Sequence, residues 1–139
     1  MPTPEWCAQF VGLVDGEGHF ALKKNRGRWC LPELRINMRA DDRPMMEALR
    51  RALGFGRIYE KHRAEKRNPT VEFRVSKRLD CLALVRLFDA HPLWSRKRAD
   101  YEIWRVAVLL HQDRKNAAHA HVEELMHQIR DIRAFKETV

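Results

Sequence analysis

The chain has few cysteines, and their spacing excludes two kinds of small fold. Its 139 residues contain three, Cys7, Cys30 and Cys81, far apart in the sequence. A zinc ribbon needs closely spaced Cys-x-x-Cys pairs, and a disulfide framework needs an even and denser set. We therefore expect reduced, partly buried thiols.

Long apolar runs and a secretion signal are also missing. No uncharged stretch reaches the roughly 18 residues that a membrane-spanning helix requires. The first residues, MPTPEW, lack the basic region that opens a signal peptide. We expect a cytoplasmic or nucleoid protein with no membrane partner.

Acidic residues are scarce relative to basic ones. The sequence has 19 Asp and Glu against 27 Lys and Arg, which gives a formal net charge of +8. Apolar residues make up 45% of the chain, enough for one folded domain at this length. This balance favours nucleic acid as the partner, because each phosphate that is neutralised releases condensed counterions. A cationic surface kept for solubility is the alternative.

Hydrophobic periodicity predicts an α+β fold in the order helix, strand, strand, helix, strand, strand and then helices. The helices are expected at residues 6–14, 44–53, 79–91 and 99–111, and the strands at residues 19–24, 33–39, 56–61 and 70–76. Gly16 and Gly18 are expected to end the first helix. This order fits a four-stranded antiparallel DNA-binding sheet with helices on its other face.

The end of the chain is expected to extend this domain. Residues 1–112 form the predicted domain, and residues 113–139 form an extra C-terminal helical extension packed on it. Its helix is expected at about residues 119–135. Simple packing, bracing of a dimer and contact with flanking DNA are the alternative roles of this helix.

The outward face of the predicted sheet is strongly basic and carries only two acids, Glu33 and Glu72. A merely solvated face mixes charges, so a surface laid along a DNA groove accounts for it better. The strand residues expected to contact DNA are Lys23, Asn25, Arg35, Asn37, Arg39, Arg57, Tyr59, Lys61 and Arg74. The basic residues of the connections, expected to hold the phosphate backbone, are Arg26, Arg28, Arg63, Lys66 and Arg67.

The segment FVGLVDGEG, residues 10–18, continues a stripe of minimal side chains along one helix face. Ala8, Gly12 and Gly16 recur at every fourth position. Glycine inside a helix costs about 1 kcal/mol relative to alanine, which makes sense where another backbone approaches closely. The segment occurs once, so we expect the same helix of a second copy as partner. Ala8, Val11, Gly12 and Gly16 are the expected interface residues.

Two acids, Asp15 and Glu17, end this segment, where the helix dipole disfavours negative charge. A two-fold axis would bring two copies of each together. Divalent cations prefer carboxylates and backbone carbonyls and would offset that repulsion. Such acids above a basic sheet suit two-metal phosphodiester hydrolysis. The alternative is that they are turn-forming acids before a strand.

Residues 10–18, followed by His19 and Phe20, resemble the signature of the LAGLIDADG homing endonucleases in its Asp-Gly-Glu-Gly variant. The stretch PLWSRKRADY, residues 92–101, looks like a second landmark of that family, and the resemblance covers roughly residues 6–110 in element order. It implies a homodimeric, sequence-specific endonuclease. Such an enzyme makes metal-dependent double-strand breaks with short 3′ overhangs at a long, near-palindromic site in double-stranded DNA.

The resemblance also implies a metal site. Glu17 takes the position of the catalytic acid that binds the metal, and the carbonyl of Gly16 that of a further ligand. Asp15 takes a position that is more often structural. Mg²⁺ is the expected cofactor, with Mn²⁺ as an alternative ion, and Ca²⁺ is expected to bind without supporting cleavage.

A catalytic lysine near the active centre corresponds best to Lys97, with Arg96 or Arg98 as alternatives one residue away. Some members of the family carry a glutamine late in the second strand. The nearest residues here are Asn37 and Met38, so that role is not carried over.

Two other functions remain open. The same fold serves RNA-splicing maturases and DNA-binding regulators without cleavage, although an intact Glu17 beside Gly16 argues for an active site. The second alternative is a metal-binding module built on histidines. Their spacing does not place them on one helical face as i, i+4 pairs do. These histidines are His111, His119, His121 and His127.

Overall fold

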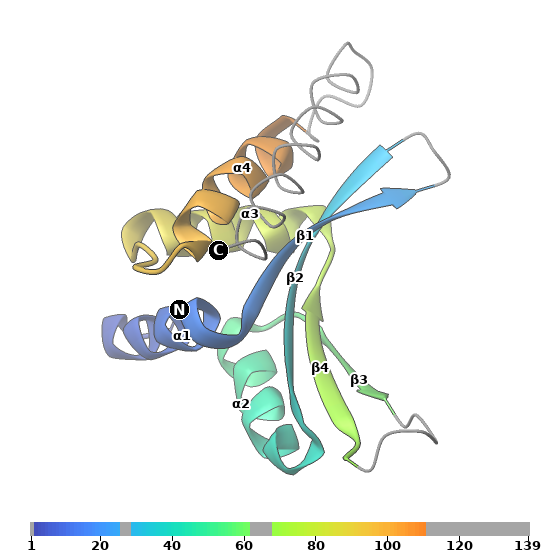
Figure 1. Cartoon of the computed structure of the whole chain (residues 1–139). Coiled ribbons are helices and arrows are strands. Elements are labelled where there is room, and N and C mark those ends of the chain that lie inside the picture. The colour runs from blue at the N-terminus through green and yellow to red at the C-terminus, as the bar shows by residue number, and fades with distance from the viewer. Residues whose placement is uncertain (1, 26–28, 62–67, 111–139) are drawn as a thin grey trace.

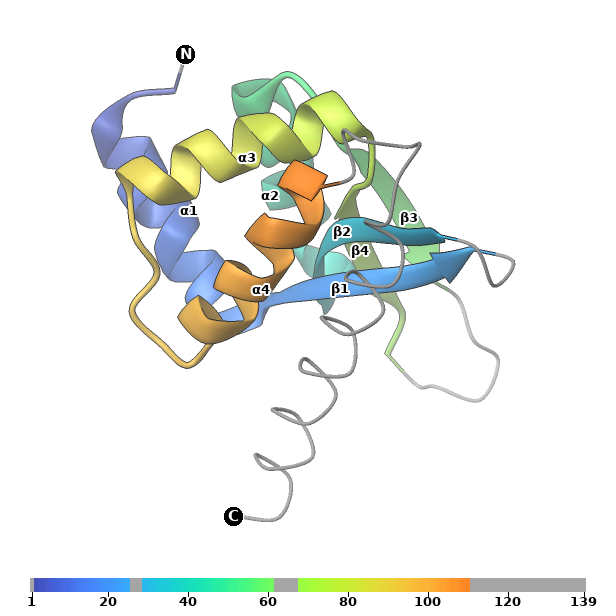
Figure 2. The same cartoon turned by 90° about the horizontal axis from the view of Figure 1, so that it is seen from above.

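Four α-helices lie on one face of a four-stranded sheet in the computed structural model, which describes residues 2–25, 29–61 and 68–110 (Figures 1 and 2). The elements are α1 (Pro4–Glu17), β1 (Gly18–Asn25), β2 (Trp29–Arg39), the 3-10 turn η1 (Ala40–Asp42), α2 (Arg43–Leu53), β3 (Arg57–Lys61), β4 (Thr70–Val75), α3 (Arg78–Ala90) and α4 (Lys97–Leu110). All strand pairs are antiparallel, in the order β1-β2-β4-β3. The predicted fold class is confirmed.

The sheet curves away from the helices. In Figure 1 the strands bow, so that the β1–β2 hairpin points to the upper right and the β3–β4 hairpin to the lower right, both away from α1. No helix of the described ranges covers the opposite face. We call that face, which carries Lys23, Arg35, Arg57 and Arg74, the outer face.

The first helix is longer than expected. Thr3 Oγ1 accepts a hydrogen bond from the Trp6 N–H at 3.1 Å and caps its start. Gly16 was expected to help end the helix, which was wrong, because the helix continues through Gly16 to Glu17 and Gly18 is its C-cap. A Cβ at Gly18 would lie 2.6 Å from Val14 Cγ1, so glycine is needed there for close approach to the preceding turn. Both acids of the segment therefore lie in the last turn of α1.

The second strand is also longer than expected, because it runs through Pro32. Proline cannot donate to a strand ladder and usually ends a central strand. Here Leu34 is the first β2 residue paired with β4, so at Pro32 the strand has only β1 as a neighbour. Cys81 Sγ lies 3.6 Å from the Pro32 carbonyl, and burial raises the pKa of this thiol to about 12. Cys7 and Cys81 are buried free thiols, as expected.

The core lies between the helices and the inner face of the sheet. Apolar residues of the strands alternate inward, as predicted, and are joined by an aromatic cluster around Phe20. The Phe20 ring lies 5.6 Å from Phe88, 5.5 Å from Tyr101 and 5.2 Å from Trp104 between centroids. Buried Trp104 also donates its indole N–H to the Glu33 carbonyl at 3.1 Å. These contacts fix α3 and α4 on the sheet.

Some expectations fall on residues that the structure does not describe. The extension at residues 113–139 and its helix are among them. No helix of the described ranges is both long and apolar enough to cross a membrane.

The turn from α2 to β3 provides a test of the packing. Gly56 has a φ of 104°, and a Cβ there would lie 2.4 Å from the Phe73 ring. Gly56→Ala is expected to lower the free energy of unfolding by about 2–4 kcal/mol, because it combines a strained backbone with overpacking. Urea denaturation measures this loss.

Gly54→Ala is the matched control. Gly54 has a φ of 82°, but a Cβ there would meet nothing within 4 Å. The free energy of unfolding that Gly54→Ala loses is therefore expected to reflect the backbone strain alone, about 1–2 kcal/mol. If Gly56→Ala and Gly54→Ala lose the same free energy of unfolding, the predicted contact between a Cβ at position 56 and the Phe73 ring is contradicted.

Candidate active site and nucleic-acid interface

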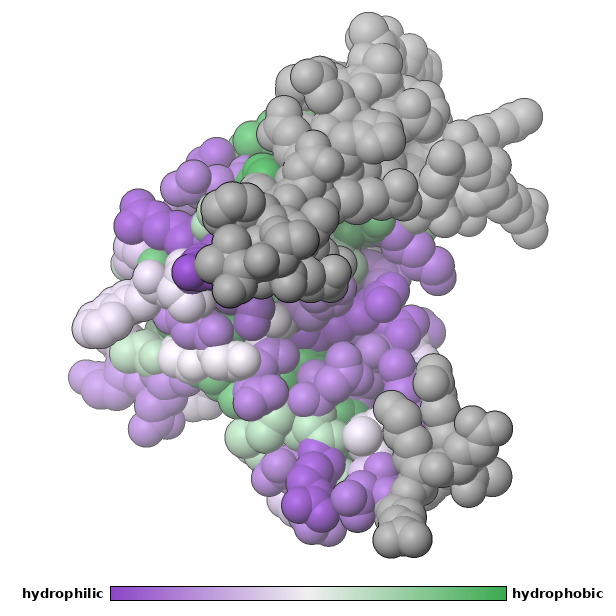
Figure 3. Space-filling model, in the orientation of Figure 1, coloured by the Kyte–Doolittle hydropathy of each residue, from purple (hydrophilic) through white to green (hydrophobic). Residues whose placement is uncertain are grey.

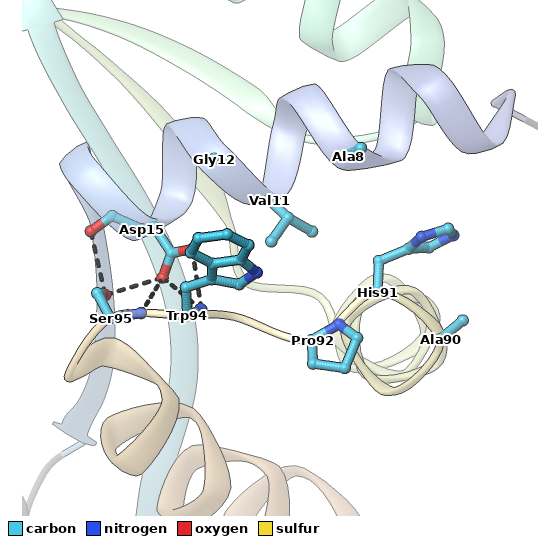
Figure 4. Close-up of a pocket in the computed structure, with 9 residues that line it drawn as sticks. All are labelled: Ala8, Val11, Gly12, Asp15, Ala90, His91, Pro92, Trp94 and Ser95. Atoms are coloured by element: carbon cyan, nitrogen blue, oxygen red, sulfur yellow. Dashed lines mark hydrogen bonds between the residues drawn. The ribbon is translucent and has the colours of Figure 1, made fainter.

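The last turn of α1 is fastened to the connection between α3 and α4 (Figure 4). The Asp15 carboxylate accepts hydrogen bonds from the Trp94 N–H, at 3.1 and 3.0 Å to its two oxygens, and from the Ser95 N–H at 2.9 Å. The Ser95 hydroxyl bonds to the same carboxylate at 2.8 Å. One carboxylate thus joins segments about 80 residues apart in the sequence.

Lys97 lies at the same place, as the first residue of α4. Its backbone N–H donates to Ser95 Oγ at 3.1 Å, and its Nζ approaches the Asp15 carbonyl at 3.5 Å. Of the two alternative cations, Arg98 pairs with Glu102 on the surface of α4 and Arg96 is exposed. Lys97 is therefore the basic residue of this group whose side chain bonds to the last turn of α1.

The fastening also shifts the ionisation of Asp15. Its partial burial would raise the pKa of the carboxyl group. The hydrogen bonds from Ser95 and Trp94, with the nearby charge of Lys97, outweigh burial and hold the pKa below its usual value. Asp15 is thus a charged anchor.

Glu17 lies two residues further along, with a different environment. Its side chain is exposed, and no hydrogen bond or ion pair in the described part of the chain engages its carboxylate. Gly16, also exposed, places its carbonyl in the same last turn, where helix carbonyls lack intrahelical partners. A hard divalent cation prefers these two ligand types. Mg²⁺, the cofactor that the family resemblance implies, is a cation of this kind.

The described part of the chain holds only a few candidate ligands for such a cation. Within the described ranges, no three His, Cys, Asp or Glu side chains come together to hold a metal. Glu17 is the exposed acid of the α1 end, because Asp15 is engaged by Trp94 and Ser95. Glu17 and the Gly16 carbonyl are therefore the candidate ligands that the described residues offer at this helix end.

The small-residue stripe of α1 lies at the surface. Ala8, Gly12 and Gly16 are exposed, and a Cβ at either glycine would meet nothing within 4 Å. Val11, also expected at the interface, is only 6% exposed and packs mainly in the core. The stripe therefore leaves room for another backbone.

A groove of about 740 Å³ runs beside this stripe (Figure 4). Ala8, Val11, Gly12 and Asp15 line it from α1, and residues of the α3 end and of the following connection line the other side. Trp94 of that connection is 93% exposed. Trp94 and Ser95 lie in the stretch PLWSRKRADY that resembles a family landmark. No role was predicted for either residue, because both contact Asp15, which is about 80 residues away in the sequence.

The outer face carries the basic residues expected on it. Between the two grey regions of Figure 3, the surface over the strands is hydrophilic. Arg35 lies opposite His19 on one side and opposite Arg74 on the other, and Arg74 lies opposite Arg57. The exposed residues of the predicted DNA-contacting set are Lys23, Asn37, Arg39, Arg57 and Tyr59.

The two acids of this face differ from expectation. They were expected to stand outward among the cations, but Glu33 is only 4% exposed and Glu72 only 1%. The physical reason is that basic side chains cover them. Arg35 pairs with Glu33 at 2.6 Å, while Arg74 pairs with Glu72 at 2.5 Å and Lys61 does so at 3.2 Å.

The structure leaves part of the predicted interface undescribed. The side chain of Asn25 lies outside the described set. So do the basic residues of the connections, Arg26, Arg28, Arg63, Lys66 and Arg67, and the histidines at positions 111, 119, 121 and 127.

Known sequences resemble the chain over most of its length. A family model described as LAGLIDADG endonuclease matches residues 10–108. The probable intron-encoded endonuclease Cox1-I1b of Schizosaccharomyces pombe is 27% identical over 108 residues, which cover 74% of this chain. The chain spans only 27% of the length of that relative.

Crystal structures of homing endonucleases share the fold. I-TnaI matches with a TM-score of 0.76 at 25% identity, over 99% of each chain. The LAGLIDADG meganuclease I-AabMI, crystallised with uncleaved DNA, matches with a TM-score of 0.68 at 26% identity, over 77% of this chain and 37% of that one. I-SmaMI, bound to its uncleaved DNA target in the presence of calcium ions, shares the fold at 22% identity with a TM-score of 0.74.

The Asp15 anchor predicts a pH-dependent stability. Asp15→Asn is expected to lower the free energy of unfolding by about 1.5–3 kcal/mol at pH 7, because hydrogen bonds to a charged group are lost. The pKa of Asp15 is lower in the folded chain. Its contribution is therefore complete above the unfolded pKa, about 3.9, and is lost as the pH falls through the folded value.

Urea denaturation of both proteins from pH 7 to pH 3 measures this dependence. The difference between wild type and Asp15→Asn is expected to shrink as the solution becomes acidic. Asp41→Asn, at an exposed position of η1, is the control and is expected to cost less than about 0.5 kcal/mol. A difference for Asp15→Asn that stays constant with pH would contradict the anchoring role.

Proposed function

Because the chain belongs to the LAGLIDADG endonuclease family, we propose that it is a sequence-specific DNA endonuclease that acts as a homodimer. It makes Mg²⁺-dependent double-strand breaks at a long, near-palindromic site. The observation that carries this proposal is the exposed carboxylate of Glu17 in the last turn of α1, which no hydrogen bond or ion pair engages within the described residues, in the same helix turn that Lys97 Nζ approaches at the Asp15 carbonyl.

The α1 stripe supports the homodimer. Gly12 and Gly16 leave open space on an exposed helix face, and the segment that carries them occurs once per chain. Two copies of α1 would meet along this stripe around a two-fold axis, as an isologous contact. That contact would bring two copies of Glu17 together, one for each DNA strand.

The outer face supports DNA as the substrate. It is curved, free of helices in the described ranges, and rich in exposed cations such as Lys23, Arg39 and Arg57. A β-surface of this kind fits a major groove, where base pairs can be distinguished from one another. I-AabMI, which shares the fold, was crystallised with DNA. Each subunit would take one half-site.

Each residue of the α1 end has a separate task in this proposal. Glu17 and the carbonyl of Gly16 would hold Mg²⁺, which activates water and stabilises the leaving 3′-oxygen when it is bound. Lys97 places an ammonium group where negative charge develops on the phosphate. Asp15 holds the backbone before Lys97 and keeps that ammonium group beside the last turn of α1.

Glu17→Gln tests the catalytic role. We expect a loss of cleavage of at least about 100-fold, because a neutral amide is a poor ligand for Mg²⁺. Incubation with a randomised duplex library in Mg²⁺, followed by sequencing of the cut ends, measures cleavage. Selection of bound duplexes in Ca²⁺ measures binding, which should remain within a few-fold of wild type.

Glu102→Gln, on the exposed surface of α4, is the charge-matched control and should cut like wild type. Loss of binding in Glu17→Gln would instead assign Glu17 a structural role. A wild-type chain that selects a DNA site but never cuts it would contradict the endonuclease proposal. That result would favour a DNA-binding regulator, and selection of RNA over DNA would favour a maturase.

Gly12→Leu tests the dimer. The position is open within one copy, and leucine is a better helix former by about 1 kcal/mol, so the monomer should keep its stability. The added side chain would block the approach of a second α1. We expect the dimer dissociation constant, measured by analytical ultracentrifugation, to rise by at least tenfold, about 1.4 kcal/mol.

Ala48→Leu, at an exposed position of α2, adds similar bulk elsewhere and should leave association unchanged. A wild-type chain that stays monomeric at high concentration and on DNA would contradict the homodimer. Unchanged association of Gly12→Leu would contradict the interface.

A further inference from the structure

Two matching acid–arginine pairs occupy the outer face. On β2, Glu33 and Arg35 are separated by one residue, and on β4 so are Glu72 and Arg74. The strands run antiparallel with Arg35 opposite Arg74, so the two arginines are neighbours. Since Glu33 and Glu72 lie on opposite sides of the arginines along the strands, the four residues form an approximately two-fold symmetric group. We call it the arginine pair with its two glutamates.

Each glutamate binds its arginine along the same edge of the guanidinium group. Arg35 donates from Nε at 2.8 Å and from Nη2 at 2.6 Å to Glu33. Arg74 donates from Nε at 2.8 Å to Glu72, and its Nη2 forms an ion pair with the same carboxylate oxygen at 2.5 Å. A guanidinium group has five N–H donors, so three remain for another partner.

Arg74 is held from a second side as well. The centre of its guanidinium group lies 4.5 Å from the centroid of the Tyr59 ring on β3. Glu72 also bonds to Lys61 at 3.2 Å, which places a second cation beside it. The arginine therefore has little freedom to choose another orientation.

The glutamates are too buried to serve another purpose at the surface. The side chain of Glu72 is only 1% exposed and that of Glu33 only 5%, whereas Arg74 and Arg35 are 22% and 27% exposed. A negatively charged side chain beneath a phosphate-binding surface weakens the overall attraction of that surface for DNA. The two glutamates instead orient the guanidinium groups of Arg35 and Arg74. They also offset the repulsion between these two arginines, which lie directly opposite each other.

Orientation matters for one kind of DNA contact. A planar guanidinium fork with fixed direction matches the two acceptors of a guanine edge in the major groove. A phosphate accepts a hydrogen bond from many directions and needs no fixed fork. Arg39 and Arg57 are exposed and have no ion-pair partner in the described part of the chain. These two match the phosphate role.

We propose that Glu33 and Glu72 are specificity-determining positioning residues. They fix Arg35 and Arg74 as a pair that reads guanines at neighbouring positions in each half-site, and neither glutamate touches DNA. Arg39 and Arg57 hold the phosphate backbone. This inference rests on the proposed DNA-binding function and adds which arginines carry sequence preference.

The test compares base preferences position by position. The full-length chain selects duplexes from a randomised library in Ca²⁺ at fixed salt, and sequencing gives the preference at each position of the site. Glu72→Gln is expected to lower a guanine preference about tenfold at one or two positions of each half-site. Preferences elsewhere should persist, and binding to unrelated DNA should stay equal or rise, because one negative charge is removed.

A second variant ties this loss to the arginine. Arg74→Lys keeps the charge but removes the fork, and it should lose preference at the same positions as Glu72→Gln. The double variant that combines Glu72→Gln with Arg74→Lys should lose no more guanine preference than either single variant. Glu33→Gln should act at a different, neighbouring position through Arg35.

Glu60→Gln is the matched control on the same sheet, since Glu60 is exposed and pairs with Arg43 of α2. It should leave every preference unchanged. An even loss at all positions, or different positions for Glu72→Gln and Arg74→Lys, would overturn the positioning role. If Glu72→Gln fails to fold, Arg74→Lys still tests the proposal. An unchanged guanine preference in Arg74→Lys would show that Arg74 does not read guanine.

The two levels of the proposal fail in different ways. A wild-type chain that selects no sequence contradicts the proposed function and this inference together. A wild-type chain with a defined site whose variants keep every preference contradicts this inference alone.

Discussion

The carboxylate of Asp15 holds the end of α1 against the start of α4, and the arrangement of the candidate active site depends on it. Three donors from Trp94 and Ser95 converge on this group. Because Asp15 is turned toward the connection, Glu17 remains exposed and Lys97 lies beside the helix end. Two acids only two residues apart therefore have different tasks, one structural and one available for chemistry.

The helix that carries these acids has two working faces. Phe10, Val11 and Val14 are buried against the core, while Ala8 and Gly12 are exposed on another face. A strip of minimal side chains at the surface does not favour the single protomer, because glycine there weakens the helix without improving the packing. In the proposed homodimer the same strip would let two backbones approach, and this approach would bring two copies of Glu17 together.

The outer face shows that charge and orientation are separate properties of a binding surface. A net charge of +8 accounts for attraction to a polyanion at long range. It does not account for two buried acids beneath the cations. Glu33 and Glu72 reduce the positive charge of the face but direct the guanidinium groups of Arg35 and Arg74. A surface selected only for charge would have no reason to keep them.

The sequence by itself determined the order and type of the elements, the family and the candidate metal ligand. These rest on local patterns: strand and helix periods, and a short segment whose residues are contiguous. Tertiary structure decided the rest. Pro32 could be placed inside a strand only once β4 was known to begin pairing at Leu34. The burial of Glu72 depends on cations from β3 and β4, and the role of Asp15 depends on backbone N–H groups about 80 residues away, which no local pattern reports.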